Sequence, residues 1–397
     1  MGQVSGTRWA HGCELLEYRY GPDLLPGRAD GGPAGMWRYR ALLPVDPGPI
    51  HYPVPVGGTP LLALPGLRAV TGVPELFVKD ETRGPSASNK DRATALVLEG
   101  GLRTGADTIT TASTGNAAVA TALGAAAVAL RSVIFVSTGC RPDKVGLMRA
   151  AGAQVFALAD GYSAAVELSR AAAREFGWLD RNTGVNPYTT EAKKTVALEI
   201  WEQLRRQPPD VVVAPVGDGP TLAGLAKGFD ELLACGGIER LPRLIGVQAA
   251  NCQPLVRAWA GADGSATSGA PGDPASGATT IADGIAVTRP TAGALALDAV
   301  RRTGGAMVAV PDDALSAAGA TLLRYGGLGS EPAGAAGLAG LVAALAGGLV
   351  DRAERVVVML TGRELAAGPT PVPEPAAPVI EPDLDAVRAA LADHPRN

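Results

Sequence analysis

Histidine and paired cysteines, the usual material of metal and triad chemistry, are scarce in this 397-residue sequence. The three histidines lie outside any segment with a catalytic pattern, which leaves almost nothing for a catalytic triad or a histidine-ligated metal; they are His11, His51 and His394. The four cysteines are too widely spaced for metal ligation, and we expect free thiols; they are Cys13, Cys140, Cys235 and Cys252. We therefore expect no metal, and demanding chemistry has to come from an organic cofactor.

The sequence also lacks an excess of positive charge and a long apolar run. Its 35 basic and 39 acidic residues give a net charge of −4, which provides no attraction to nucleic acid or anionic lipid. No stretch has the length of a membrane span, and Met1 is not followed by a signal-peptide pattern. We expect a cytoplasmic protein that binds neither nucleic acid nor membrane and buries a large core.

Short apolar runs alternate with helical patterns between Pro60 and about Leu365, which predicts an α/β fold with mostly parallel sheets. The expected strands are Leu76–Val78, Thr108–Thr110, Val133–Val136, Gln154–Ala157, Val211–Ala214, Leu244–Gln248, Met307–Val310 and Val356–Leu360. The expected helices are Arg92–Gly100, Ala117–Ala129, Lys144–Ala151, Ser163–Glu175, Lys193–Leu204, Leu222–Ala234, Asp312–Arg324 and Pro332–Leu345.

So many strands predict two lobes within one catalytic body at residues 51–365. We expect the smaller lobe at about 100–181, inserted in the larger one. Residues 1–50 are expected to form an extension that wraps the body, and 366–397 a proline-rich, loosely tethered tail. Gly261–Gly277 has the composition of a flexible surface loop.

Lys90 is the first candidate for catalysis. It follows an apolar strand and a turn of small polar residues, and it opens a predicted helix. A lysine amine held in this way can form an imine with a carbonyl cofactor. Ser88, two residues earlier, can cap the helix or contact a phosphate. Taken alone, Ser-Xaa-Lys at a helix start is more often a solvated lysine.

Two strand-to-helix loops have the chemistry of anion sites. In Thr111–Asn116, backbone N–H groups at a helix start suit a substrate carboxylate, with Ser113 and Thr114 adding hydroxyls and Gly115 permitting close approach. Gly217–Thr221 repeats the design after an apolar strand and suits a phosphate, with the Asp218 carboxylate expected to turn away. Ordinary capping and a plain tight turn are the alternatives for these loops.

A third loop residue follows the last expected strand of the body. Thr361, at the end of Val356–Leu360, stands where open parallel sheets usually contact a ligand. If its hydroxyl faces the pyridine nitrogen of a cofactor, that nitrogen stays largely unprotonated, which favours elimination and replacement over transamination. A Thr-Gly pair that only ends a strand in a turn is the alternative.

The order of these motifs resembles the fold-type II enzymes that use pyridoxal 5'-phosphate (PLP), a two-lobed fold like that of the tryptophan synthase β subunit. The resemblance is strongest to the threonine synthase family, whose Lys-Asp-Glu and Pro-Thr-Gly-Ser-Phe-Lys-Asp-Arg correspond to 79–81 and 85–92. Similar matches are Ser113–Asn116, Asn186–Tyr188 with Lys194-Thr195, Gly217–Thr221, Gly246–Ala249, Glu331–Ala335 and Leu360–Gly362.

The resemblance implies a role for each candidate residue. Lys90 would hold PLP as an internal aldimine and later serve as the general base. The other implied roles are phosphate binding by Gly217, Asp218, Gly219 and Thr221, ring contacts by Asn116 and Thr361, and carboxylate binding by Ser113, Thr114 and Gly115. The resemblance also suggests a homodimer that acts on a small amino acid.

Departures from the family pattern leave the substrate open. Asn89 replaces the usual aromatic residue, and Thr189 replaces an arginine that could bind a substrate phosphate. Three cations are candidates to replace that arginine: Arg141, Lys144 and Lys193. The segment Thr280–Val287 looks like the corresponding part of serine/threonine dehydratases.

Three hypotheses follow. The first is a PLP-dependent lyase or synthase of threonine synthase type, which converts O-phosphohomoserine to threonine by elimination and replacement at Lys90. The second is a serine/threonine dehydratase or a β-replacement enzyme, such as a cysteate synthase-like catalyst of a secondary pathway. The third, of another class, is a non-catalytic protein that keeps the fold for binding or regulation.

Overall fold

The computed structural model describes residues 3–8, 14–19, 35–183, 186–261, 280–365 and 377–392. The expected loop Gly261–Gly277 lies outside these ranges except for Gly261, as do His11, Cys13 and His394. Cys140 and Cys252 are buried free thiols, and Cys235 is a partly buried one. None of the helices in the described ranges has both the length and the apolar character needed to cross a bilayer.

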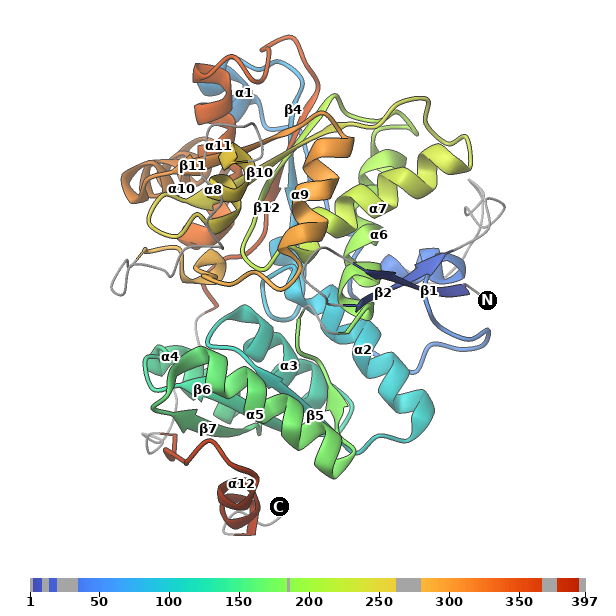
Figure 1. Ribbon diagram of the computed structural model, residues 1–397. Helices are drawn as coiled ribbons and strands as arrows, with labels where there is room; N and C mark the ends of the chain where they lie inside the picture. The colour runs from blue at the N-terminus through green and yellow to red at the C-terminus, as the bar shows by residue number, and fades with distance from the viewer. Residues whose placement is uncertain are drawn as a thin grey trace.

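The larger of two main sheets has six strands in the order β11-β10-β9-β12-β4-β3 (Figure 1). All neighbouring pairs are parallel except β3 with β4. The strands are β3 (Leu61–Leu62), β4 (Leu76–Asp80), β9 (Val211–Pro215), β10 (Arg243–Ala249), β11 (Ala306–Val310) and β12 (Val356–Leu360).

Helices cover both faces of this sheet, so alternate residues of one strand enter different cores. Val211 and Val213 face one core, whereas Val212 and Ala214 face the other. The first core is closed by α1 (Pro65–Thr71), α10 (Asp312–Gly326) and α11 (Pro332–Ala346). The second is closed by α6 (Tyr188–Gln203), α7 (Pro220–Ala234), α8 (Pro254–Ala260) and α9 (Gly293–Arg302).

The smaller sheet is fully parallel, with the order β7-β6-β5-β8. Its strands are β5 (Thr108–Ala112), β6 (Arg131–Ser137), β7 (Gln154–Leu158) and β8 (Leu179–Asp180). Helices α3 (Asn116–Ala127) and α4 (Pro142–Ala150) pack on one face, and α5 (Gly161–Phe176) packs on the other. Figure 1 shows this sheet and its helices below the larger sheet.

Helix α2 (Lys90–Thr104) connects the two parts and is buried along most of its length. It packs against α6 of the larger part and α3 of the smaller part. Under its first turn, the Arg92 guanidinium lies 2.6 Å from a carboxylate oxygen of Glu81 and 2.7 Å from one of Glu199, and Lys79 also binds Glu199 at 2.7 Å. This buried ion cluster fixes the start of the helix that carries Lys90.

Both ends of the chain contribute to the structure. Strands β1 (Gln3–Arg8) and β2 (Glu14–Arg19) form an antiparallel pair. The 3-10 segment η2 (Gly35–Leu42) buries Trp37 and Tyr39, and Arg38 binds Glu202 of α6 at 3.0 Å.

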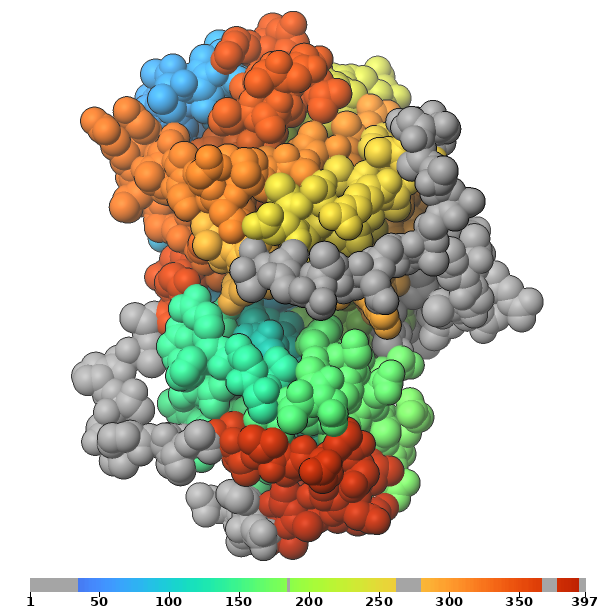
Figure 2. All heavy atoms as spheres, turned by 60° about the vertical axis from the view of Figure 1, so that its left-hand side comes forward, coloured from blue at the N-terminus to red at the C-terminus, as the bar shows by residue number. Residues whose placement is uncertain are grey.

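The described part of the C-terminal segment is attached to the smaller sheet rather than loosely tethered. The Ala157 amide donates to the Pro378 carbonyl, and the Ile380 amide donates back to Ala157, both at 2.9 Å. Helix α12 (Leu384–Ala392) packs on α5 and buries Val387. Figure 2 shows this segment covering the outer surface of the smaller part.

Candidate active site

Lys90 lies where the loop after β4 meets the end of β12. The short helix η3 (Glu81–Arg83) follows β4, and the chain then turns into α2 at Lys90. The Asn89 amide donates to the Thr361 carbonyl at 2.9 Å, and Ser88 pairs with Gly362 in an isolated antiparallel bridge. Thr361 is therefore a neighbour of the segment that holds Ser88 and Lys90, although the two were predicted from distant parts of the sequence.

The Lys90 amine is partly buried and is held by one neutral side chain. Its Nζ donates to Asn89 Oδ1 at 3.0 Å. Burial lowers the pKa of Lys90 to about 8, opposed by Glu331 and assisted by the positive charge of Arg181. A lysine in this state has a substantial neutral fraction near physiological pH, so it can act as a nucleophile.

The turn between β9 and α7 presents free backbone donors at a helix start. Within the described residues, the amides of Gly217, Asp218 and Gly219 donate to no protein acceptor. Gly219 has a φ of +103°, and a Cβ there would lie 2.5 Å from the Ala292 carbonyl oxygen. Only glycine allows this approach, and the free amides at the start of α7 are suited to binding an anion.

Thr221, in the first turn of α7, links this turn to Lys90. Its Oγ1 accepts from Lys193 Nζ at 3.0 Å and from Asn89 Nδ2 at 3.3 Å. Asn89 Oδ1 also accepts from Lys90 Nζ, so the side-chain amide of Asn89 connects the lysine to the turn. Burial, with repulsion from Lys90, holds the pKa of Lys193 well below its usual range.

The Asp218 carboxylate is bound on the side of Thr291. It accepts from the Thr291 amide at 2.6 Å and from the Thr291 hydroxyl at 2.7 Å. The carboxylate therefore has a protein partner and does not need to contact a ligand bound at the turn. Burial raises the pKa of Asp218, while the bonds from Thr291 oppose that shift.

The loop from Ser113 to Asn116 joins β5 to α3 and uses some of its donors internally. The Ser113 amide donates to the Phe135 carbonyl at 3.1 Å, and the Gly115 amide donates to Ser113 Oγ at 3.1 Å. A carboxylate at this loop would therefore be bound by the remaining groups, which include the Thr114 amide and hydroxyl.

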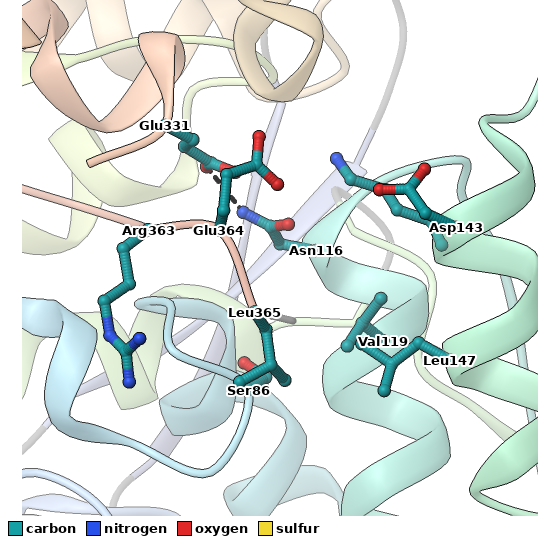
Figure 3. A pocket seen from close by; sticks show the side chains of 10 residues that line it. Ser86, Asn116, Val119, Asp143, Leu147, Glu331, Arg363, Glu364 and Leu365 are labelled. Atoms are coloured by element: carbon teal, nitrogen blue, oxygen red, sulfur yellow. Dashed lines mark hydrogen bonds between the residues drawn. The ribbon is translucent and has the colours of Figure 1, made fainter. Parts of the chain in front are cut away.

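Asn116 and Glu331 meet across the cleft. Asn116 Nδ2 donates to Glu331 Oε1 at 2.6 Å, as the dashed line in Figure 3 shows. A Cβ at Gly362 would lie 2.5 Å from Glu331 Oε1, so glycine makes room for this contact. Burial raises the pKa of Glu331, and the nearby Lys144 opposes that shift.

A pocket opens beside the Asn116–Glu331 pair and is lined by both parts of the molecule. Its lining residues are Ser86, Asn116, Val119, Asp143, Lys144, Leu147, Glu331, Arg363, Glu364 and Leu365. Lys144 of α4 also reaches Asp283 of the 3-10 segment η5 (Asp283–Ile285), with 2.7 Å between Nζ and Oδ2. This ion pair joins the two parts over the cleft.

The chemistry of these groups fits PLP. The cofactor combines an aldehyde, which a neutral lysine amine attacks, with a phosphate, which suits free helix-start amides and a hydroxyl. Lys90 and the turn at Gly217–Thr221 present these groups, and the Asn89 amide connects them. In the described part of the chain, no group of three or more His, Cys, Asp or Glu side chains could hold a metal ion.

Sequence reasoning missed the positions of several functional groups. Asn89 was noted only as a departure from a pattern, although it joins Lys90 to Thr221. Arg181 was not singled out, yet it is fully buried and lies within electrostatic reach of Lys90. No local pattern marks these residues, because their contacts are distant in the sequence.

A family model described as "Pyridoxal-phosphate dependent enzyme" matches residues 53–362. The chain is 34% identical to a threonine synthase of Methanosarcina acetivorans over 90% of this chain and 86% of that protein. It is 32% identical to threonine synthases of Methanocaldococcus jannaschii and Mycobacterium leprae, over 90% and 88% of this chain and 87% and 95% of theirs.

Solved structures with the same fold include maize serine racemase and the processed form of threonine deaminase isoform 2 from Solanum lycopersicum. The TM-scores are 0.63 and 0.61, each at 21% identity. The alignments cover 78% and 84% of this chain, with 90% of the racemase and 87% of the deaminase. At this identity the likeness supports the fold alone.

Proposed function

The chain belongs to the pyridoxal-phosphate dependent enzymes, and from that premise we propose that it is a threonine synthase-type lyase in which Lys90 bonds the cofactor. The predicted resemblance, the two-lobed α/β fold of type II, the cofactor and the enzyme class are confirmed. The protein is a PLP-dependent lyase. Its substrate and the roles of single residues are the subject of the proposal.

The observation that carries the proposal is the contact chain from Lys90 through Asn89 to Thr221. An aldehyde at the lysine and a phosphate at the turn can be bound together by these groups. We assign the cofactor phosphate to Gly217, Asp218, Gly219 and Thr221, with Ser88 beside it. When bound, the cofactor supplies an electron sink for carbon–hydrogen and carbon–oxygen cleavage.

The ring and substrate contacts follow from the same arrangement. We propose that Asn116 and Thr361 contact the cofactor ring and that Ser113, Thr114 and Gly115 receive the substrate carboxylate. The Lys90 amine, with its lowered pKa, takes and returns the proton at the substrate Cα. Glu331 orients Asn116 through its 2.6 Å contact.

We propose O-phosphohomoserine as substrate and threonine as product, with phosphate leaving from Cγ and water adding at Cβ. The similarity to several threonine synthases over most of their length supports this choice. Dehydratase or β-replacement activity is the second candidate. It is favoured by the segment at Thr280–Val287, where Asp283 contacts Lys144 at the cleft.

A panel of O-phosphohomoserine, O-phosphoserine, serine and threonine separates these candidates. We expect threonine and equimolar phosphate from O-phosphohomoserine, and no activity from Lys90→Ala. Phosphate release without threonine would reject the synthase reaction. Keto acid from serine or threonine would support the dehydratase. Lys90→Ala should also lose the visible cofactor band that borohydride bleaches, and a retained band would reject Lys90 as the attachment site.

We also propose a homodimer in the cytoplasm. Helices α1 and α10 are in contact, and each exposes large apolar side chains, including Val70, Leu323 and Tyr325. Such a face is suited to association with a second copy. Light scattering should give twice the chain mass, and Leu323→Lys should reduce it; cell fractionation tests the location.

A further inference from the structure

Arg181 is placed at the edge of the smaller sheet where the substrate is expected to bind. Its amide donates to the Thr110 carbonyl of β5 at 2.9 Å, and the next residue, Asn182, accepts from the Ala112 amide at 2.8 Å. Arg181 therefore lies beside the end of β5, where the loop Ser113–Asn116 begins. Its side chain is fully buried.

Among the described residues, the partners of the Arg181 guanidinium are neutral hydroxyls. Its Nε donates to Thr94 Oγ1 at 3.2 Å, and its Nη1 donates to Thr183 Oγ1 at 2.9 Å. Within the described residues, Nη2 is buried and has no partner. Burial of a guanidinium without an anion is costly, and here it lowers the pKa of Arg181 to about 10.

The three aspartates that act on Arg181 electrostatically are bound by other residues. Asp218 is held by Thr291, and Asp180 accepts from the Asn182 amide at 2.7 Å. Asp91 accepts from the Ser86 amide at 3.1 Å. The described residues thus orient the guanidinium with two hydroxyls and leave the Nη2 nitrogen, with its two N–H donors, available for a ligand.

The three cations considered from the sequence are already engaged. Arg141 binds Asp143 at 2.7 Å on the surface, and Lys144 binds Asp283. Lys193 donates to Thr221 at the turn assigned to the cofactor phosphate. Of these four cations, Arg181 is the one with a buried donor nitrogen, Nη2, that has no partner among the described residues.

Resting on the proposed function, we propose that Arg181 binds the anionic group on the substrate's side chain and so selects amino acids with a charged side chain. Thr189, at the position where threonine synthases often have an arginine, cannot supply this charge. Thr189 is the second residue of α6, the helix that follows the connection carrying Arg181, and among the described residues its buried hydroxyl also has no partner. In this chain we assign the cationic role to position 181.

The test compares two unreactive amino acids on the PLP-loaded enzyme. 2-Amino-5-phosphonopentanoate carries an anion at the end of its side chain, and norvaline has the same carbon chain without it. Binding of each is followed by the change in cofactor absorbance. The wild type should prefer the phosphonate, and Arg181→Met should weaken it about 10- to 150-fold, the range for a hydrogen bond to a charged group. Norvaline affinity should change less than about threefold, since it lacks the charged group.

Matched variants and a melting curve separate this role from a structural one. Arg302→Met removes an exposed, paired arginine away from the pocket and should leave both affinities unchanged. Arg181→Gln keeps donors for Thr94 and Thr183 and should lose the phosphonate preference while melting near the wild type. If Arg181→Met weakens the binding of both ligands equally, or of neither, the inference is overturned. A wild type that binds PLP but shows no preference for the phosphonate also overturns it. Failure of the wild type to bind PLP would instead reject the proposed function.

Discussion

The lowered pKa of Lys90 gives the most direct prediction about this site. With a pKa of about 8, about 9% of the amine is neutral at pH 7. At the ordinary value of about 10.4 the neutral fraction would be about 0.04%, so the site raises the amount of reactive amine by about 200-fold. We therefore expect Lys90 to react as an unusually nucleophilic lysine in the cofactor-free protein.

Competitive acetylation measures this property without the cofactor. The protein is treated with a trace of acetic anhydride across a pH series, with free Nα-acetyl-lysine as internal standard, and the Lys90 peptide is quantified by mass spectrometry. Its acetylation should rise with pH around a midpoint of about 8, because only the neutral amine reacts. Arg181→Met should move the midpoint upward, because a positive charge that disfavours the ammonium is removed.

Two outcomes would refute this reasoning. A midpoint near that of the internal standard would mean that burial does not favour the neutral form of Lys90. An unchanged midpoint in Arg181→Met would mean that the guanidinium does not act on the lysine. Arg302→Met serves as the control, since Arg302 is 44% exposed and bound to Asp298, and it should leave the midpoint in place.

Three further substitutions test the framework around the site. Arg92→Met leaves two buried carboxylates with one lysine and should lower the free energy of unfolding, measured by urea denaturation, by about 3–5 kcal/mol. Arg83→Met removes an exposed arginine and should lower it by less than about 1 kcal/mol. Equal effects of the two substitutions would contradict the burial argument. Gly219→Ala should abolish cofactor retention after gel filtration, whereas Gly139→Ala, with open space around it, should not. Lys144→Met removes the ion pair over the cleft and should weaken norvaline binding about fivefold, as expected for about 1 kcal/mol, and unchanged binding would show that the pair does not hold the cleft.

The sequence was sufficient for the elements that carry a local pattern. The expected helix Arg92–Gly100 is α2, which begins at Lys90 and ends at Thr104, where Gly105 has a φ of +73°. The expected strand Val211–Ala214 is β9 with one further residue. These segments are recognisable because apolar runs, helical spacing and turn residues act over a few positions. Helix α9 was missed, because its short apolar stripe lies between loops.

The site was predictable only in part, for a physical reason. Lys90 and the turn at Gly217–Thr221 each follow a strand and open a helix, so local chemistry marks them. The contact of Asn89 with Thr221 spans 132 positions and depends on how two helix starts meet. Arg181 carries no local signal, since its importance lies in a buried donor without a partner. Burial and charge balance are properties of the packed molecule.

The C-terminal segment has a consequence for how the molecule avoids aggregation through the edge of its smaller sheet. Strand β7 ends the smaller sheet and would otherwise present unpaired backbone groups, which invite strand pairing between molecules. The bonds from Ala157 to the chain at Pro378 and Ile380 occupy part of that edge, and α12 covers the neighbouring apolar surface. Removing the chain from Pro378 onward would therefore expose an aggregation-prone sheet edge on an otherwise intact enzyme. The truncated protein should precipitate before it loses its active-site geometry.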